Sequence, residues 1–384
     1  MIRDQKRIEG FLAGLRHFVD ARCIPAEALV EEQNEIPPDL IAGMRGQMLF
    51  GYTIPEEYGG LGFTTEEMVL AAFEISRCSP AFRSRCGTNT GIGSEGLVQD
   101  GTEEQKKKYL PRLATGEITG AFALTEPDYG SDAASLKTSA VRDRGDYIIN
   151  GTKCFITNAP VAGIFTVMAR TDPANRGAGG VTAFLVESGT KGLSTGPSYS
   201  KMGQAGSPVS EVHFENCRVP ASSIIGGVPG MGFKTAMRVL NKQRLHLAAL
   251  CVGPAIRLQE EMLRFTAARH QFGKPIGEFQ LVQAMIADSH TEILAARSMV
   301  LDCARKRDAG IDVTLEASMC KYYASEMVGR VADRAVQVFG GAGYTAAAGI
   351  ERFYRDVRLF RLYEGTSQIH QLNIAKLMLR KIGG

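Results

Sequence analysis

The hexapeptide Tyr363-Glu364-Gly365-Thr366-Ser367-Gln368 lies near the C-terminal end of the chain. It follows the charged run Arg355-Asp356-Val357-Arg358-Leu359, and it leads into residues 367–381, whose pattern predicts a final helix. A glutamate followed by a glycine can approach a ligand closely, because glycine has no Cβ to obstruct the approach. The hexapeptide therefore marks Glu364 as a candidate active-site carboxylate.

Composition bounds the class of protein. The chain has 384 residues, of which 44% are hydrophobic and 22% charged, as is typical of a globular protein. This length exceeds what one core fills, so two or three domains are expected. The net charge of +3 gives no field for nucleic acid or an anionic membrane. No apolar run approaches the length of a membrane span, so membrane insertion is not expected.

The cysteines indicate a reducing compartment. None of them forms C-x-x-C or stands at metal-ligand spacing from a histidine, so no metal site is predicted. Scattered single thiols are typical of reduced proteins, and the N-terminal residues lack the apolar segment of a secretory signal. We therefore predict a cytoplasmic protein. The eight cysteines are Cys23, Cys78, Cys86, Cys154, Cys217, Cys251, Cys303 and Cys320.

The pattern of apolar and turn-forming residues changes twice along the chain, and it predicts three domains, at residues 1–119, 120–229 and 230–384. The first is mostly helical, with apolar residues at helical spacing and a capped helix start at Thr102. The second has short β-branched and aromatic runs that predict a small β domain. The third has long amphipathic segments that predict a four-helix bundle. Its helices are expected at approximately 233–269, 281–308, 315–339 and 367–381.

Two local patterns refine this division. Asn150-Gly151 is a favourable hairpin turn, so we expect two strands to meet there. The Gly230-Met231-Gly232 and Gly341-Ala342-Gly343 pieces do not complete a G-x-G-x-x-G, and strands do not alternate with helices along the sequence. A nicotinamide dinucleotide fold is therefore not expected.

Four segments together resemble the acyl-CoA dehydrogenase family, and the resemblance covers nearly the full chain. They are residues 121–138, which include Thr125-Glu126-Pro127, residues 150–159, residues 269–274 with Gln337-Val338-Phe339-Gly340-Gly341, and the hexapeptide at 363–368. Alone, each segment also fits an ordinary turn, hairpin, helix cap or helix-end charge. The resemblance implies an α+β multidomain fold with an N-terminal helical domain, a central β domain and a C-terminal four-helix bundle.

The resemblance also implies FAD as the cofactor and assigns its contacts. In the β domain Phe122, Leu124 and Thr125 would line the flavin, Ser131 would reach the pyrophosphate or the substrate, and Phe155 and Thr157 would lie at the flavin face. Many relatives carry tryptophan where this chain has Phe155, and phenylalanine still supplies an apolar face. The remaining implied contacts, part of them reaching the FAD of a neighbouring subunit, are Arg269, Gln271, Phe272, Gln337, Gly340, Gly341, Thr366 and Gln368.

By resemblance Glu364 is the catalytic base for α,β-dehydrogenation of an acyl-CoA thioester. Some relatives hold their base on the first long helix of the last domain, where this chain has Gln243, which cannot accept a proton in that way. Arg244, Tyr363, Gly365 and Ser131 are the implied substrate contacts. The resemblance further implies a homotetramer built as a dimer of dimers, electron-transfer flavoprotein as the acceptor, and a place in fatty-acid β-oxidation.

Two other functions stay open on the sequence. An acyl-CoA oxidase would reoxidise the flavin with oxygen, although such proteins usually carry a further C-terminal domain. A non-catalytic flavoprotein scaffold would fit the same fold, but an intact Glu364 argues against it. The acyl group is not readable from the sequence. Glu95 could face the acyl pocket, but a buried, paired glutamate is the commoner outcome.

Overall fold

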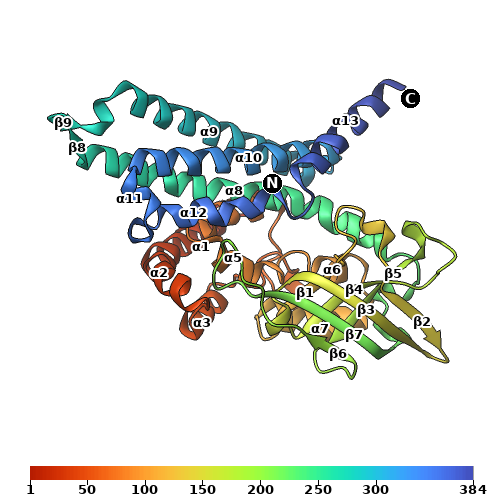
Figure 1. The fold of residues 1–384 in the computed structure, drawn as a ribbon. Coiled ribbons are helices and arrows are strands. Elements are labelled where there is room, and N and C mark those ends of the chain that lie inside the picture. The colour runs from red at the N-terminus through yellow and green to blue at the C-terminus, as the bar shows by residue number, and fades with distance from the viewer. Residues whose placement is uncertain (384) are drawn as a thin grey trace.

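The structure is a computed structural model, in which residues 1–383 are described, with the side chain of Lys381 left out. The N-terminal part is helical, as expected, and its helices pack beneath the long C-terminal helices (Figure 1). A capping box at Thr102 and Gln105 begins α7, which confirms the predicted helix start. The helices of this part are α1 (Gln5–Phe18), α2 (Ile24–Gln33), α3 (Pro38–Gly46), α4 (Thr65–Ile75), α5 (Pro80–Gly87), α6 (Glu95–Asp100) and α7 (Glu103–Ala114).

A seven-stranded sheet occupies the middle of the chain. Its strand order is β1-β4-β2-β3-β7-β6, with β5 pairing antiparallel to β4. The long strands β3 and β7 form the antiparallel centre, and β1 runs parallel to β4. The strands are β1 (Gly120–Ala123), β2 (Ser139–Asp143), β3 (Asp146–Thr157), β4 (Ile164–Arg170), β5 (Val181–Glu187), β6 (Leu193–Thr195) and β7 (Val209–Pro220).

The predicted hairpin at Asn150-Gly151 is wrong. Both residues lie inside β3, where the pairing with β7 shifts register between Ile149 and Gly151. A Cβ on Gly151 would lie 2.6 Å from Thr138 Oγ1, so glycine is needed for close packing at a bulge and not for a turn. The turn lies earlier, between β2 and β3, where Arg144 has a φ of 57°.

Long helices dominate the C-terminal part, and the structure confirms the predicted segments to within two residues. Figure 1 shows α8, α9 and α10 side by side, with the β8–β9 hairpin at one end and α13 projecting from the other. Gly310 and Gly340 follow α9 and α10 with φ of 78° and 60°, as helix stops do. The elements are α8 (Gly232–Ala268), β8 (His270–Gln271), β9 (Lys274–Pro275), α9 (Gln280–Asp308), α10 (Thr314–Phe339), α11 (Gly341–Tyr344), α12 (Ile350–Val357) and α13 (Ser367–Gly383).

Three apolar clusters hold these parts together. The largest is shared by the N-terminal helices and α8, α9, α10 and α12, so both helical parts form one core. A second cluster lies within the curved sheet. A third joins the other face of the sheet to α7 and to the first turns of α8. The start of α8 is therefore fixed to the sheet, while its middle is fixed to the helical core.

Candidate active site

Glu364 stands in a tight turn between α12 and α13. Its φ is 54° and that of Gly365 is 95°, so two consecutive residues adopt the left-handed region. For a glutamate this conformation is strained, and it persists only where the surroundings hold it. Thr366 accepts a hydrogen bond from the amide of Ile369 (3.2 Å) and so caps α13, whereas Gln368 is exposed on that helix.

Two buried side chains hold this turn through its carbonyl oxygens. Lys321 of α10 donates to the carbonyl of Gly365 (2.6 Å). His370 of α13 lies 3.3 Å from the carbonyl of Glu364, and because a carbonyl only accepts, Nε2 carries the proton. Burial lowers the pKa of Lys321 to about 8 and that of His370 to about 3. The turn is therefore fixed by two helices, and His370 is neutral.

Burial also raises the pKa of the Glu364 carboxyl. Three cations oppose this rise, in decreasing order Arg83 of α5, Lys321 and Arg244 of α8. The side chain is half-buried, and its Oε2 has no hydrogen-bond partner within residues 1–383. Its backbone N–H likewise has no acceptor among those residues. Glu364 is thus a carboxylate of raised basicity beside an unused amide donor.

The structure brings three of the predicted substrate contacts to this place. Tyr363 and Gly365 flank Glu364 in the turn, and the charge of Arg244 reaches its carboxylate. Arg244 donates to Asn241 (2.7 Å), and its buried Nε has no partner among the described residues. The fourth predicted contact, Ser131, is exposed in the loop between β1 and β2.

The structure settles the environments of Gln243 and Glu95. Gln243 is buried, and its Oε1 lies 3.2 Å from His246 Nδ1. Glu95 is also buried, and Lys242 Nζ lies 2.8 Å from each of its carboxylate oxygens. Glu95 is therefore the paired, buried glutamate that was the commoner expectation. Its charge is already balanced.

The predicted cofactor contacts of the β domain lie on β1, on β3 and in the loop after β1. Phe122 and Leu124 are largely buried in the cluster between the sheet and the helices, and Thr125 is half-buried. Phe155 lies at a bulge of β3 with a φ of 58°, and its ring is 66% exposed against Tyr199 (ring centroids 5.3 Å apart). Thr157, at the end of β3, is half-buried. An exposed aromatic ring in strained backbone is an unusual surface feature.

A buried ion pair joins the two segments. Lys153 Nζ lies 2.8 Å from Glu126 Oε1 and donates to the carbonyl of Leu124 (3.0 Å). Glu126 also accepts from the amides of Lys137 (2.6 Å) and Thr138 (2.8 Å). The pair therefore fixes the loop after β1 against β3. No role was predicted for either residue from the sequence.

Six other predicted cofactor contacts lie at the far end of the C-terminal helices. Arg269, Gln271 and Phe272 stand at or beside the β8–β9 hairpin, at the end of the bundle away from the sheet (Figure 1). Phe272 is 94% exposed and has a φ of 51°. Gln337, Gly340 and Gly341, all exposed, stand at the same end, because Phe265 of α8 stacks on Phe339 of α10 (4.1 Å). One chain alone does not bring the two sets together.

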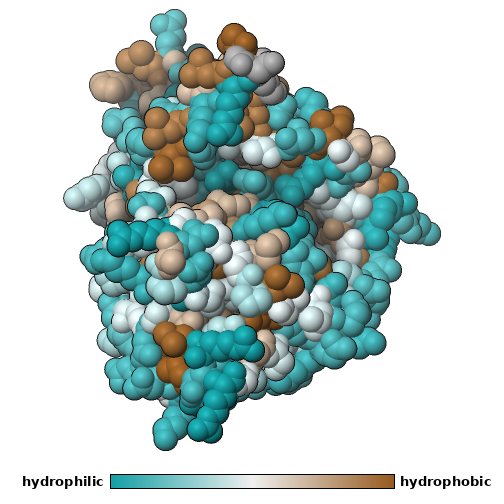
Figure 2. Space-filling model, turned by 90° about the vertical axis from the view of Figure 1, so that its right-hand side faces the viewer, coloured by the Kyte–Doolittle hydropathy of each residue, from teal (hydrophilic) through white to brown (hydrophobic). Residues whose placement is uncertain are grey.

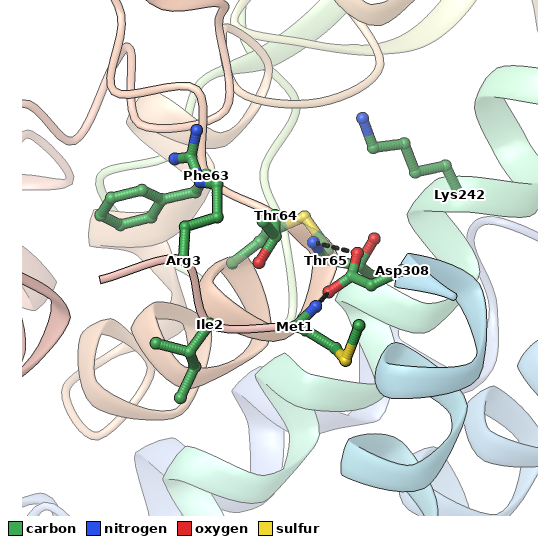
Figure 3. Close-up of a pocket in the computed structure, with 9 residues that line it drawn as sticks. Met1, Ile2, Arg3, Phe63, Thr64, Thr65, Lys242 and Asp308 are labelled. Carbon is green, nitrogen blue, oxygen red and sulfur yellow. Dashed lines mark hydrogen bonds and ion pairs between the residues drawn. The ribbon is translucent and has the colours of Figure 1, made fainter. Parts of the chain in front are cut away.

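A hollow of about 480 Å³ lies elsewhere, between the first residues of the chain, α4, α8 and α9. Figure 3 shows the carboxylate of Asp308 there, between the amide of Thr65 (2.8 Å) and the terminal amine of Met1. None of the predicted site residues lines this hollow. The turn at Glu364 combines backbone strain, burial and unpartnered polar atoms, so it is the candidate active site.

Residues 1–383 lack two further features. No cluster of three or more His, Cys, Asp or Glu side chains suitable for a metal ion occurs among them. None of their helices combines the length and the apolar character needed to cross a bilayer.

Comparison with known proteins shows to which family the chain belongs. Models of the N-terminal, middle and C-terminal domains of acyl-CoA dehydrogenase match residues 6–117, 121–217 and 230–379. An acyl-CoA dehydrogenase of Bacillus subtilis is 40% identical over 365 residues, which cover 95% of this chain and 96% of that protein. Butyryl-CoA dehydrogenase of Megasphaera elsdenii superposes with a TM-score of 0.94 at 32% identity, covering 99% and 100% of the two chains.

A chain in the structure of the electron transferring flavoprotein of Acidaminococcus fermentans superposes equally well, with a TM-score of 0.94 at 35% identity. The match covers 99% of this chain and 100% of that one. The chain belongs to the acyl-CoA dehydrogenase family. Its members are FAD-dependent and act on CH–CH bonds.

The residues present fit the cofactor. The exposed ring of Phe155 offers an apolar face for a planar ring system. Thr125 and Thr157 are both half-buried, and the amide of Cys154, next to Phe155, donates to the carbonyl of Thr125 (2.9 Å). A guanidinium such as that of Arg269 suits a pyrophosphate.

Proposed function

We propose that Glu364 is the base that removes the α-proton of a bound acyl-CoA in the α,β-dehydrogenation to a trans-2-enoyl-CoA. The observation that carries the proposal is the carboxylate itself. It is half-buried, its Oε2 has no hydrogen-bond partner within residues 1–383, and its pKa is raised. A base is most effective when its pKa lies close to the working pH.

The chain supplies more than the base. An α-proton is weakly acidic, so the developing enolate needs stabilisation. The free amide of Glu364 is a donor that could point to the thioester oxygen, and such donors commonly contribute about 3 kcal/mol. Arg244 and Lys321 add positive charge around the reacting centre. FAD, when bound, supplies the acceptor for the hydride that leaves the β-carbon.

We further propose that Phe122, Leu124, Thr125, Phe155 and Thr157 contact the flavin, with Ser131, Thr366 and Gln368 as further contacts. Arg269, Gln271, Phe272, Gln337, Gly340 and Gly341 would serve the cofactor of a neighbouring subunit. Their distance from the sheet and the exposure of Phe272 support that division. Tyr363, Gly365 and Arg244 would contact the substrate.

The same reasoning favours a homotetramer, built as a dimer of dimers from three-domain chains with boundaries near 119/120 and 229/230. Exposed apolar residues on α13 support assembly, and Figure 2 shows hydrophobic side chains at the top of the face that carries this helix. They are Leu372, Met378, Leu379 and Ile382.

The electron acceptor we propose is an electron-transfer flavoprotein, supported by the likeness to a chain in the structure of such a protein. A cytoplasmic location and a role in fatty-acid β-oxidation are proposed with it. All eight cysteines are free and buried, which is consistent with a reducing compartment.

The role of Glu364 is tested by proton exchange. The holoenzyme is incubated in D₂O with an acyl-CoA analogue that cannot lose a β-hydride, and deuterium at the α-carbon is followed by NMR. We expect exchange with the wild type and a loss of at least about 1,000-fold in Glu364→Gln. Equal exchange by both proteins would exclude Glu364 as the base.

A further inference from the structure

The run Arg355-Asp356 on α12 lies shortly before the Glu364 turn, and the proposed mechanism gives it no role. Both residues bind the loop of the β domain that joins β6 to β7. The carboxylate of Asp356, which is buried, accepts from the backbone amide of Gln204. The guanidinium of Arg355 donates to the carbonyl of Met202 (3.0 Å). The helix that leads into the Glu364 turn is therefore tied to the β domain.

Gln204 is the strained point of this loop. It is buried and has a φ of 56°, a left-handed conformation that is uncommon in residues other than glycine. The neighbouring Gly203 packs closely, since a Cβ there would lie 2.7 Å from Asp356 Oδ1. Backbone strain of this kind persists only where the surrounding structure holds it. The loop is therefore held tightly against α12 at Gln204.

The side chain of Gln204 bridges two helices. Its Nε2 donates to the carbonyl of Asp356 on α12 (3.2 Å), and its Oε1 accepts from the hydroxyl of Ser84 on α5 (3.1 Å). The residue before Glu364 is also in reach. Burial raises the pKa of the Tyr363 hydroxyl, and a hydrogen bond with the Gln204 side chain is among the effects that oppose this rise. Gln204 thus contacts both α12 and the turn that follows it.

Ser84 extends the connection to the predicted flavin contacts of the sheet. Its carbonyl accepts from Nδ2 of Asn158 (2.9 Å), and Asn158 directly follows Thr157 at the end of β3. Ser84 therefore binds Asn158 through its carbonyl and Gln204 through its hydroxyl. A continuous chain of hydrogen bonds runs from the end of β3, through α5 and Gln204, to the helix before the Glu364 turn.

We infer that Gln204 is a positioning residue, which holds the Glu364 turn at a fixed separation from the end of β3 and so aligns the base with the flavin. The base and the hydride acceptor must reach adjacent carbons of one substrate, and a misplacement of about 1 Å costs on the order of 100-fold in rate. This inference rests on the proposed dehydrogenase function, and it names a residue that serves the reaction through the turn.

The test measures flavin reduction in Gln204→Met, which keeps the length of the side chain and removes both of its hydrogen-bonding atoms. The holoenzyme is mixed anaerobically in a stopped-flow instrument with a thioester that reduces the wild type. We expect the limiting rate constant to fall on the order of 50-fold, because the base is displaced relative to the flavin. The half-saturating thioester concentration and the dissociation constant for FAD should stay within about threefold of the wild type.

Gln105→Met is the matched control for loss of a buried glutamine. Gln105 of α7 donates to the carbonyls of Ser222 and Ile224 (2.8 Å each), so it also joins a helix to the β domain, but not to α12 or the Glu364 turn. This variant should lower the free energy of unfolding and leave the limiting rate constant within about twofold of the wild type. Bound flavin absorbance and far-UV CD confirm that each variant is folded.

Ser84→Ala tests the bridge from its other side. It removes the hydroxyl bound to Gln204 Oε1, and it should lower the limiting rate constant by about 3- to 10-fold. In the double variant Gln204→Met/Ser84→Ala the rate constant should be close to that of Gln204→Met, because the bond between the two side chains is already lost.

The proposal is overturned if Gln204→Met reduces the flavin within about threefold of the wild-type rate. It is equally overturned if Gln105→Met loses as much rate, because the effect would then be general damage. If Gln204→Met does not fold, Ser84→Ala decides, and an unchanged rate in that variant overturns the proposal. Failure of every thioester to reduce the wild-type flavin would instead contradict the proposed dehydrogenase function, and the positioning role would fall with it.

Discussion

The ion pair between Lys153 and Glu126 gives a prediction whose size follows from the structure. The side chain of Lys153 is fully buried, and Glu126 is almost so. Lys153→Met keeps most of the volume and removes the charge. It leaves a buried carboxylate with two backbone donors, Lys137 and Thr138, and it leaves the carbonyl of Leu124 without its donor. Removing one partner of such a pair costs about 3 to 5 kcal/mol.

Thermal and urea unfolding of the holoenzyme measure this cost. For a chain of this length, about 3 kcal/mol corresponds to a fall in Tm of roughly 3 to 6 °C. The double variant Glu126→Gln/Lys153→Met removes both charges and should lose much less than the two single variants together. The dissociation constant for FAD should rise in Lys153→Met, since the loop after β1 is then released from β3.

Arg142→Met, on exposed β2, is the matched control for loss of a surface cation. The reasoning is refuted if Lys153→Met unfolds within about 0.5 kcal/mol of the wild type. It is also refuted if the losses of the single variants simply add, because an ion pair that holds two segments must show coupling.

Two further predictions concern the Glu364 turn. Gly365→Ala places a Cβ 3.0 Å from His370 Nε2 at a φ of 95°, so it should cost about 1 to 3 kcal/mol of stability and about 100-fold in kcat. The control Gly310→Ala, at a φ of 78° with open space around it, should cost stability alone. An equal loss of kcat in both variants would contradict the account. The pKa of Glu364 is raised in the folded protein, so ionisation of this carboxyl opposes folding. Glu364→Gln should therefore gain stability relative to the wild type as the pH rises through that pKa. Urea unfolding at pH 4 and pH 8 measures the difference in unfolding free energy between the two proteins, and a difference that does not widen at pH 8 would argue against a raised pKa.

Sequence patterns located the long helices because these segments combine apolar periodicity with clear stops such as Gly310 and Gly340. Sequence patterns did not identify two short strands, β2 (Ser139–Asp143) and β6 (Leu193–Thr195), because these strands are too brief and too exposed to show an alternating pattern. Asn150-Gly151 misled because glycine serves a bulge as well as a turn, and local sequence does not distinguish the two uses.

The sequence likewise predicted one part of the candidate site and missed another. Glu364 stands in a contiguous motif, so sequence alone could nominate it. Arg83 and Lys321 come from two different helices, and each is a lone residue in its own segment. Only tertiary packing brings them to the carboxylate, and no local signal marks them. The free amide of Glu364 and the neutral state of His370 are likewise products of the packed structure.

The most direct test of the central claim is an anaerobic titration of the purified FAD-bound protein with a panel of acyl-CoA thioesters, followed by flavin absorbance. Wild type and Glu364→Gln are measured side by side. The account predicts that at least one acyl class bleaches the flavin in the wild type, and that the variant binds FAD and is not bleached. Bleaching of both proteins would contradict the role of Glu364, and bleaching of neither would contradict the proposed reaction.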